Sequence, residues 1–236
     1  MAIPNVSIRS LFGPASKERE ATDEAIFAAA INEGFLTVTD LPYENAVNEV
    51  AKRSLLALFS LPAEKQRRLW KQNFEPNNPN LYRGWFPLHS GKSLSREGFE
   101  VGPDIVRQLP GDTDDLLYQP TPLPDEDDLP GFLQTARQYY LAMESTGNQI
   151  LASLSRGLGI PETIFAEAFR DGISTLRLLH YIPRKQLPIS AELKQTRGAH
   201  VDTGLLTILA PYQGGAGLQA MSAKGEWIDV PPREGS

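Results

Sequence analysis

Two residues, His200 and Asp202, have the types and the spacing of metal ligands. In an extended strand alternate side chains point to the same face, so this imidazole and this carboxylate would lie about 7 Å apart on one face. They would supply two of the three protein ligands in a 2-His-1-carboxylate triad, which binds ferrous iron and leaves positions open for substrate and dioxygen. A partly exposed polar stretch at the end of a strand is the alternative interpretation of this short pattern.

Extended runs lie on both sides of this pair, at 175–182 and at 205–209. Strands that flank a ligand pair indicate a jelly roll.

The stretches 176–183 (LRLLHYIP) and 198–209 (GAHVDTGLLTIL) resemble the isopenicillin N synthase-like family of non-haem iron, 2-oxoglutarate-dependent oxygenases. The order of elements upstream is also similar to the family's N-terminal region. The resemblance implies an α+β fold with a double-stranded β-helix (jelly-roll) core and a helical N-terminal region. It implies an Fe(II)/2-oxoglutarate-dependent dioxygenase that oxidises a small organic molecule, with Fe(II) as cofactor and with 2-oxoglutarate and dioxygen as co-substrates. His200 and Asp202 match the family's iron ligands, and no further catalytic side chain is assigned.

By the same resemblance, Tyr181 matches the tyrosine whose hydroxyl contacts a carboxylate of 2-oxoglutarate. Strand alternation in 175–182 places Leu179 and Tyr181 on one face and His180 on the other. We therefore expect Tyr181 to face the pocket and His180 to point away from it. A half-buried sheet aromatic is the alternative for Tyr181, since the common family form has Asn where Leu179 stands. We expect His89, in a loop, to face solvent.

The sequence has three histidines, and none follows His200. By the family's spacing, the second metal histidine and the Arg-x-Ser clamp for the far carboxylate of 2-oxoglutarate would lie beyond Ser236. We therefore expect a chain truncated at its C-terminus, with the jelly roll incomplete at that end and no activity on its own.

Helical periodicity and turn signals predict the remaining elements. A long loop region is expected at 73–128, with segments 81–88 and 96–104 that resemble segments which bacterial family members carry near the pocket. Packing of the loop by its aromatic residues is the alternative interpretation of these two segments. We expect domains at 1–115 (N-terminal dioxygenase region), 116–170 (helical support) and 171–236 (first part of the jelly roll). Helices are expected at 16–34, 43–60, 63–70, 129–158 and 163–169, with strands at 35–39, 217–221 and 225–231.

Composition excludes several classes of protein. The net charge of -6 leaves no basic face for nucleic acid, and no apolar run is long enough to span a membrane. Without cysteine, the chain can form no disulfide, thiol nucleophile or iron–sulfur ligand, and without a signal peptide the cytoplasm is the expected location. Other functional hypotheses remain: an oxidase of the same fold that draws all its electrons from the substrate, a non-catalytic jelly-roll binding protein, and a metal-independent interaction fragment. The sequence leaves the oligomeric state open.

Overall fold

A computed structural model of the chain describes residues 3–88, 96–109, 115–182, 199–202, 204–211 and 217–231, so His89 lies outside the described residues. The chain divides into two compact units. Unit 1 comprises Met1–Lys52, Leu141–Arg170 and Leu206–Ser236, and unit 2 comprises Arg53–Tyr140 and Asp171–Leu205. Within the described ranges, every helix is too short or too polar to cross a membrane.

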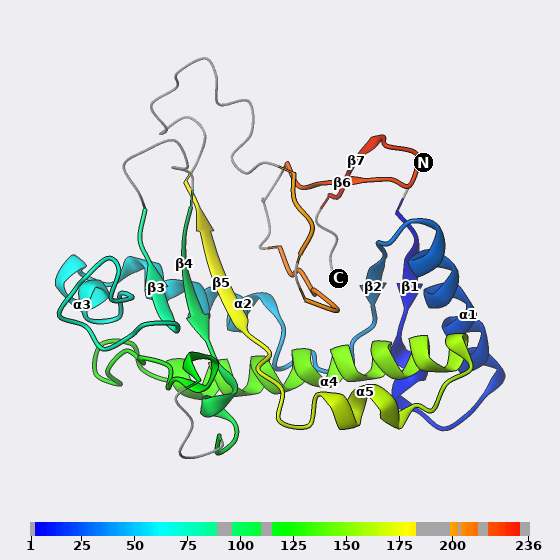
Figure 1. Cartoon of the computed structure of the whole chain (residues 1–236), viewed down its shortest axis with the longest axis horizontal. Coiled ribbons are helices and arrows are strands. Elements are labelled where there is room, and N and C mark those ends of the chain that lie inside the picture. Colours follow the sequence, from blue (N-terminus) through cyan, green and yellow to red (C-terminus); the bar gives the residue numbers. More distant parts are fainter. Residues whose placement is uncertain are drawn as a thin grey trace. The chain divides into compact units, whose positions relative to one another are not determined.

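Helices and short strands are interspersed along the chain (Figure 1). The helices are α1 (Lys17–Asn32), α2 (Glu49–Leu56), α3 (Ala63–Arg68), α4 (Phe132–Leu158) and α5 (Thr163–Ala168). The strands are β1 (Asn5–Ser7), β2 (Thr37–Thr39), β3 (Gly84–Phe86), β4 (Arg96–Val101), β5 (Leu176–Tyr181), β6 (Gln219–Met221) and β7 (Trp227–Asp229). Short 3-10 helices cover Arg9–Phe12, Ala57–Ser60, Pro103–Ile105 and Leu116–Tyr118.

In unit 1, α1 connects the parallel strands β1 and β2. The Ser16 side chain caps α1 by accepting the N–H of Arg19 at 3.1 Å, and Gly34 follows the helix with a φ of 74°. Both ends therefore agree with the helix predicted at 16–34. The hydrophobic core of this unit contains the buried side chains Val6, Ile8, Leu11, Ile26 and Ile150.

An ion pair joins α1 to the second half of α4 in the same unit. The Arg156 guanidinium donates to Asp23 through Nε (2.6 Å to Oδ2) and Nη2 (2.7 Å to Oδ1). Next to it, the ring of Phe27 lies so close to Gly157 that a Cβ there would be 2.6 Å from its Cδ2 atom. Only glycine permits this approach of the two helices.

Unit 2 contains an antiparallel sheet in which β4 lies between β3 and β5 (Figure 1). The register pairs Phe99 with Trp85 on one side and with Leu178 on the other. These residues form the apolar face of the sheet, and Trp85 and Phe99 are fully buried. The Phe132 ring of α4 packs edge-on against Phe99, with centroids 6.2 Å apart, so the first half of α4 covers this face.

The structure corrects two expectations. The region 73–128 is not a continuous loop, because it contains β3 and β4. The polar and glycine residues within β4 make its sequence untypical of a strand, and its two partner strands lie far away in the sequence. The run 205–209, expected as a strand, pairs with no described strand. Its period-two pattern instead places Leu206 and Ile208 against Gly147 of α4, each 3.8 Å from where a Cβ would lie.

The other elements agree with the expectations to within a few residues. The helix expected at 43–60 begins later, at Glu49, and continues as a 3-10 helix to Ser60. The hairpin expected at 217–231 is present as β6 and β7, with Ala220 paired to Ile228. The chain is therefore a mixed helix and strand protein, as expected.

Candidate functional site

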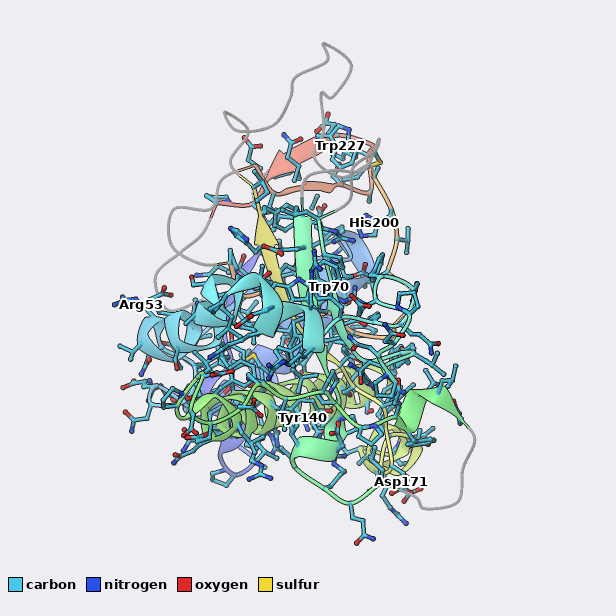
Figure 2. All side chains as sticks on the ribbon, turned by 90° about the vertical axis from the view of Figure 1, so that its left-hand side faces the viewer. Arg53, Trp70, Tyr140, Asp171, His200 and Trp227 are labelled. Carbon is cyan, nitrogen blue, oxygen red and sulfur yellow. The ribbon has the colours of Figure 1, made fainter. Side chains whose placement is uncertain are left out.

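His200 and Asp202 lie in a described segment, 199–202, that forms no strand (Figure 1). Their side chains nevertheless converge: Nε2 of His200 is 3.3 Å from Oδ1 of Asp202. Both side chains are about half exposed, at 44% and 51% (His200 is labelled in Figure 2). The two side chains therefore lie close together, although the segment 199–202 does not form the extended strand that was expected to place them on one face.

This spacing suits two neighbouring ligands of one ion. Two donors at right angles, each about 2.1 Å from a metal, are about 3.0 Å apart. The imidazole nitrogen and carboxylate oxygen of this pair are 3.3 Å apart, and they are the donor types of a facial triad. No group of three or more His, Asp or Glu side chains comes together among the residues the structure describes, so these residues offer two ligands.

Tyr181 ends β5 and is 43% exposed. Its hydroxyl oxygen lies 3.4 Å from Nη1 of Arg96, the residue paired with it across the sheet. The register places Leu179 and Arg177 on the same face as Tyr181, opposite the buried Leu178. The face that was expected to carry Tyr181 is therefore the accessible face of this sheet.

His180 lies on the opposite face of β5. Its Nδ1 atom is 2.8 Å from Oε1 of Glu97, and its ring centroid is 5.4 Å from that of Phe59. The other oxygen of Glu97 accepts the indole N–H of Trp85 at 3.2 Å. These contacts give His180 a structural role in the sheet, on the side away from Tyr181.

The start of β5 is held by a buried arginine. Arg83 is fully buried and donates to the Thr175 hydroxyl and to the Leu117 carbonyl, the latter at 3.2 Å. Burial lowers the pKa of Arg83, and nearby acidic groups such as Glu100 partly offset this effect. Because Thr175 immediately precedes β5, this contact fixes where the strand that carries Tyr181 begins.

Sequence reasoning missed a charged cluster on the Tyr181 face. Glu100 of β4 is 6% exposed and forms ion pairs with Lys71 and Arg177, the latter at 2.5 Å. Arg96 belongs to the same face. Alternation within 96–101 was a signal, because polar or glycine residues alternate there with residues that include Phe99 and Val101.

Comparison with known proteins finds relatives that are named as 2-oxoglutarate-dependent dioxygenases and hydroxylases. No family model matches the chain. The 2-oxoglutarate-dependent dioxygenase htyE of Aspergillus rugulosus is 29% identical over 251 residues, which cover 100% of this chain and 72% of that protein. The proline hydroxylase buaE of Petromyces alliaceus is 26% identical over 98% of this chain and 71% of its own length.

The solved structures that the chain resembles include proteins of the same kind. A 2OG-Fe(II) oxygenase family protein from Caulobacter crescentus superposes with a TM-score of 0.77 at 25% identity, over 99% of this chain and 72% of that one. A full-length Neurospora crassa protein, solved in complex with alpha-KG and thymine, gives a TM-score of 0.80 at 24% identity, over 99% of this chain and 71% of that one, which shows the shared fold. These likenesses show that the chain is similar, over nearly its whole length, to 2-oxoglutarate- and Fe(II)-dependent dioxygenases.

Proposed function

We propose that this protein is a non-haem iron, 2-oxoglutarate-dependent oxygenase in which His200 and Asp202 bind Fe(II) and Tyr181 contacts a carboxylate of 2-oxoglutarate. The observation that carries the proposal is the 3.3 Å approach of His200 Nε2 and Asp202 Oδ1. It occurs in a chain whose relatives, matched along its whole length, are named as dioxygenases of this kind. These relatives favour the oxygenase over a same-fold oxidase or a non-catalytic binding protein.

We propose a small organic molecule as the substrate. One relative is named a proline hydroxylase, and the Neurospora protein was solved with thymine, so both names point to small molecules. The double-stranded β-helix core and the domain division at 115 and 170 belong to the same proposal.

The bound iron and co-substrate would supply the oxidising chemistry, in which 2-oxoglutarate is converted to succinate and carbon dioxide while one oxygen atom of dioxygen oxidises the substrate. The residues of this chain have the task of binding and orientation. His200 and Asp202 offer one neutral and one anionic donor from a half-exposed segment, so solvent and ligands can reach them. Tyr181, on the accessible face of β5, offers a hydroxyl to an anion.

The test is an anaerobic calorimetric titration of the purified chain with ferrous iron. We expect one ion per chain, and we expect His200→Ala and Asp202→Ala each to weaken binding at least about 10-fold, since each removes a ligand of the metal. Asp125→Ala is the matched control, because this carboxylate is 73% exposed and its ion pair with Arg68 is a long one, at 3.8 Å.

Iron binding that survives both His200→Ala and Asp202→Ala would refute the metal assignment. Iron binding that is lost in both variants, without binding of 2-oxoglutarate to the iron-loaded wild-type chain, would leave a metal-binding protein and favour the non-catalytic alternative.

A further inference from the structure

A cavity of about 270 Å³ lies within unit 2, between α3 and the segment that leads to α4. Its walls are mostly apolar and come from three separate stretches of the chain: Leu61 and Leu69, then Pro79, then Pro122, Leu123 and Pro124. The described residues that line it do not include His200, Asp202 or Tyr181. Cavities that hold drug-sized ligands measure about 300 to 1,000 Å³, so this smaller one suits a molecule with a single ring.

The walls of this cavity are fixed by their contacts with the rest of the unit. Gly84 of β3 has a φ of 110°, and a Cβ there would lie 2.6 Å from the Leu69 carbonyl oxygen and 2.9 Å from Cγ of Pro122. Only glycine allows both walls to pack so closely against the strand. A third wall is held by a side chain, since Gln119 donates to the Pro79 carbonyl at 2.8 Å. The cavity is therefore preformed, as most ligand sites are.

Asn80 brings a polar group to these apolar walls. It is 7% exposed, and its Nδ2 atom donates to the carbonyl of Trp70 at 3.3 Å (Trp70 is labelled in Figure 2). Because a carbonyl can only accept, this contact assigns the amide nitrogen to Trp70 and leaves Oδ1 for another partner. Within the described ranges no group donates to Oδ1, and this atom is not sealed off, so it opens into the cavity that Asn80 lines. A nearly buried acceptor without a donor is unfavourable, and a ligand hydroxyl would satisfy it.

The mouth of the cavity is negatively charged. The four carboxylates of 125–128 face two cations there, Lys65 and Arg68, so two negative charges are in excess. Lys65 pairs closely with Asp128, whereas Asp125 is 73% exposed and lies 3.8 Å from Arg68, beyond hydrogen-bond reach. Such an exposed pair contributes little, so the Asp125 carboxylate can accept another cation. In the described part of the chain these carboxylates do not converge into a group that could hold a metal, which favours an organic cation.

We propose that this cavity is a second ligand site and that it binds a small hydroxyarylalkylamine, which is a protonated amine joined by a short chain to a ring that carries a hydroxyl group. The burial of the polar groups sets the orientation, because Asn80 is nearly buried and Asp125 is mostly exposed. The ammonium group binds Asp125 at the mouth, where the excess negative charge attracts a cation. The ring packs against the proline and leucine walls, and the hydroxyl donates to Asn80 Oδ1. The site does not depend on the proposed function, because it uses none of the iron or 2-oxoglutarate residues.

The experiment compares three probes by ¹H–¹⁵N NMR titration of the full chain. Tyramine carries both features, phenethylamine lacks the ring hydroxyl, and 4-hydroxyphenylacetate has the opposite charge. We expect tyramine to shift backbone amides within 61–69 and 123–128, with a Kd on the order of 1 mM, as is usual for so small a ligand. Phenethylamine should bind about 3- to 10-fold more weakly because Asn80 Oδ1 stays without a donor. 4-Hydroxyphenylacetate should bind at least about 10-fold more weakly than tyramine, because the carboxylates of 125–128 repel it.

Two substitutions test the contacts one at a time. Asn80→Ala should abolish the preference for tyramine over phenethylamine, and retained phenethylamine binding would show that the cavity is still formed. Asp125→Asn should weaken both amines about 2- to 5-fold, whereas Asp171→Asn, at an exposed carboxylate outside the cavity, is the matched control.

Three results would overturn the inference. The first is tyramine at about 10 mM that shifts no amide within 61–69 or 123–128. The second is 4-hydroxyphenylacetate that binds as well as tyramine, since the site would then not select a cation. The third is a preference for tyramine that survives Asn80→Ala. If Asn80→Ala does not fold, the three probes and Asp125→Asn still decide, because equal binding of both amines to the wild-type chain, or no effect of Asp125→Asn, also refutes the assigned contacts.

Discussion

The ion pair between Asp23 of α1 and Arg156 of α4 is expected to be a large single contribution to the stability of unit 1. The contact is bidentate, at 2.6 and 2.7 Å, and the side chains are only 11% and 18% exposed. Breaking a buried pair from one side costs about 3 to 5 kcal/mol, because the other charge is left behind. Arg156 keeps a second partner, Glu162 at 2.6 Å, but that carboxylate is 50% exposed. We therefore expect Asp23→Ala to lower the free energy of unfolding by about 3 kcal/mol, at the lower end of this range.

The effect should also depend on pH. Burial raises the pKa of Asp23, but the hydrogen bonds and charge of Arg156 outweigh burial and hold this pKa below its ordinary value of 3.8. The same hydrogen bond between Arg156 and Asp23 raises the pKa of Arg156, as expected for an ion pair in which each charge stabilises the other. A carboxylate with a depressed pKa contributes stability that is fully present above its unfolded pKa. The stability difference between wild type and Asp23→Ala should thus be constant above about pH 5 and shrink as the pH falls through the folded pKa, below 3.8.

Urea unfolding followed by circular dichroism, repeated at several pH values, measures this difference. Asp125→Ala is the control, because its exposed 3.8 Å pair with Arg68 should contribute less than about 0.5 kcal/mol. An Asp23→Ala protein as stable as wild type at pH 7, or a difference that grows on acidification, would refute the reasoning.

Three further substitutions test the sheet and the site. Gly98→Ala would force the Phe86 ring away, since the new Cβ would lie 2.2 Å from Cζ, and should lower the free energy of unfolding by about 1 to 3 kcal/mol in a urea titration. An unchanged midpoint would contradict the packing. Glu97→Gln should destabilise the protein by about 1 to 2 kcal/mol, because it weakens the charged acceptor of His180, while iron binding should remain as in wild type. A loss of iron affinity there would place His180 in the metal site after all. Tyr181→Phe should weaken 2-oxoglutarate binding about 10-fold by calorimetry with iron affinity retained, and unchanged co-substrate affinity would make Tyr181 a sheet aromatic only.

The helices were predictable because their signals are local. Apolar periodicity and end signals within 16–34 and 129–158 predict α1 and α4 to within a few residues. The closeness of His200 and Asp202 follows from their short spacing in the sequence, but the strand that was expected to place them about 7 Å apart is absent from the described segment 199–202, where the two groups are 3.3 Å apart.

The sheet face beside Tyr181 was not predictable from local signals. Arg96 and Tyr181 are 85 positions apart, and only the pairing of β4 with β5 brings them together. The segment of β4 was predicted as a loop because it contains Gly98, and glycine is unfavourable within a strand unless a neighbouring group occupies the space where its side chain would lie. In the structure that group is the Phe86 ring, a neighbour that only the register identifies.

The central claim is that His200 is a ligand of ferrous iron in this chain, and X-ray absorption of the iron-loaded protein tests it most directly. The imidazole contribution to the iron spectrum should be present in wild type, fall in His200→Ala, and remain in His180→Gln, because His180 is held by Glu97 on the opposite face of β5 from Tyr181. An imidazole contribution that is unchanged in His200→Ala, or that disappears in His180→Gln, would contradict the account.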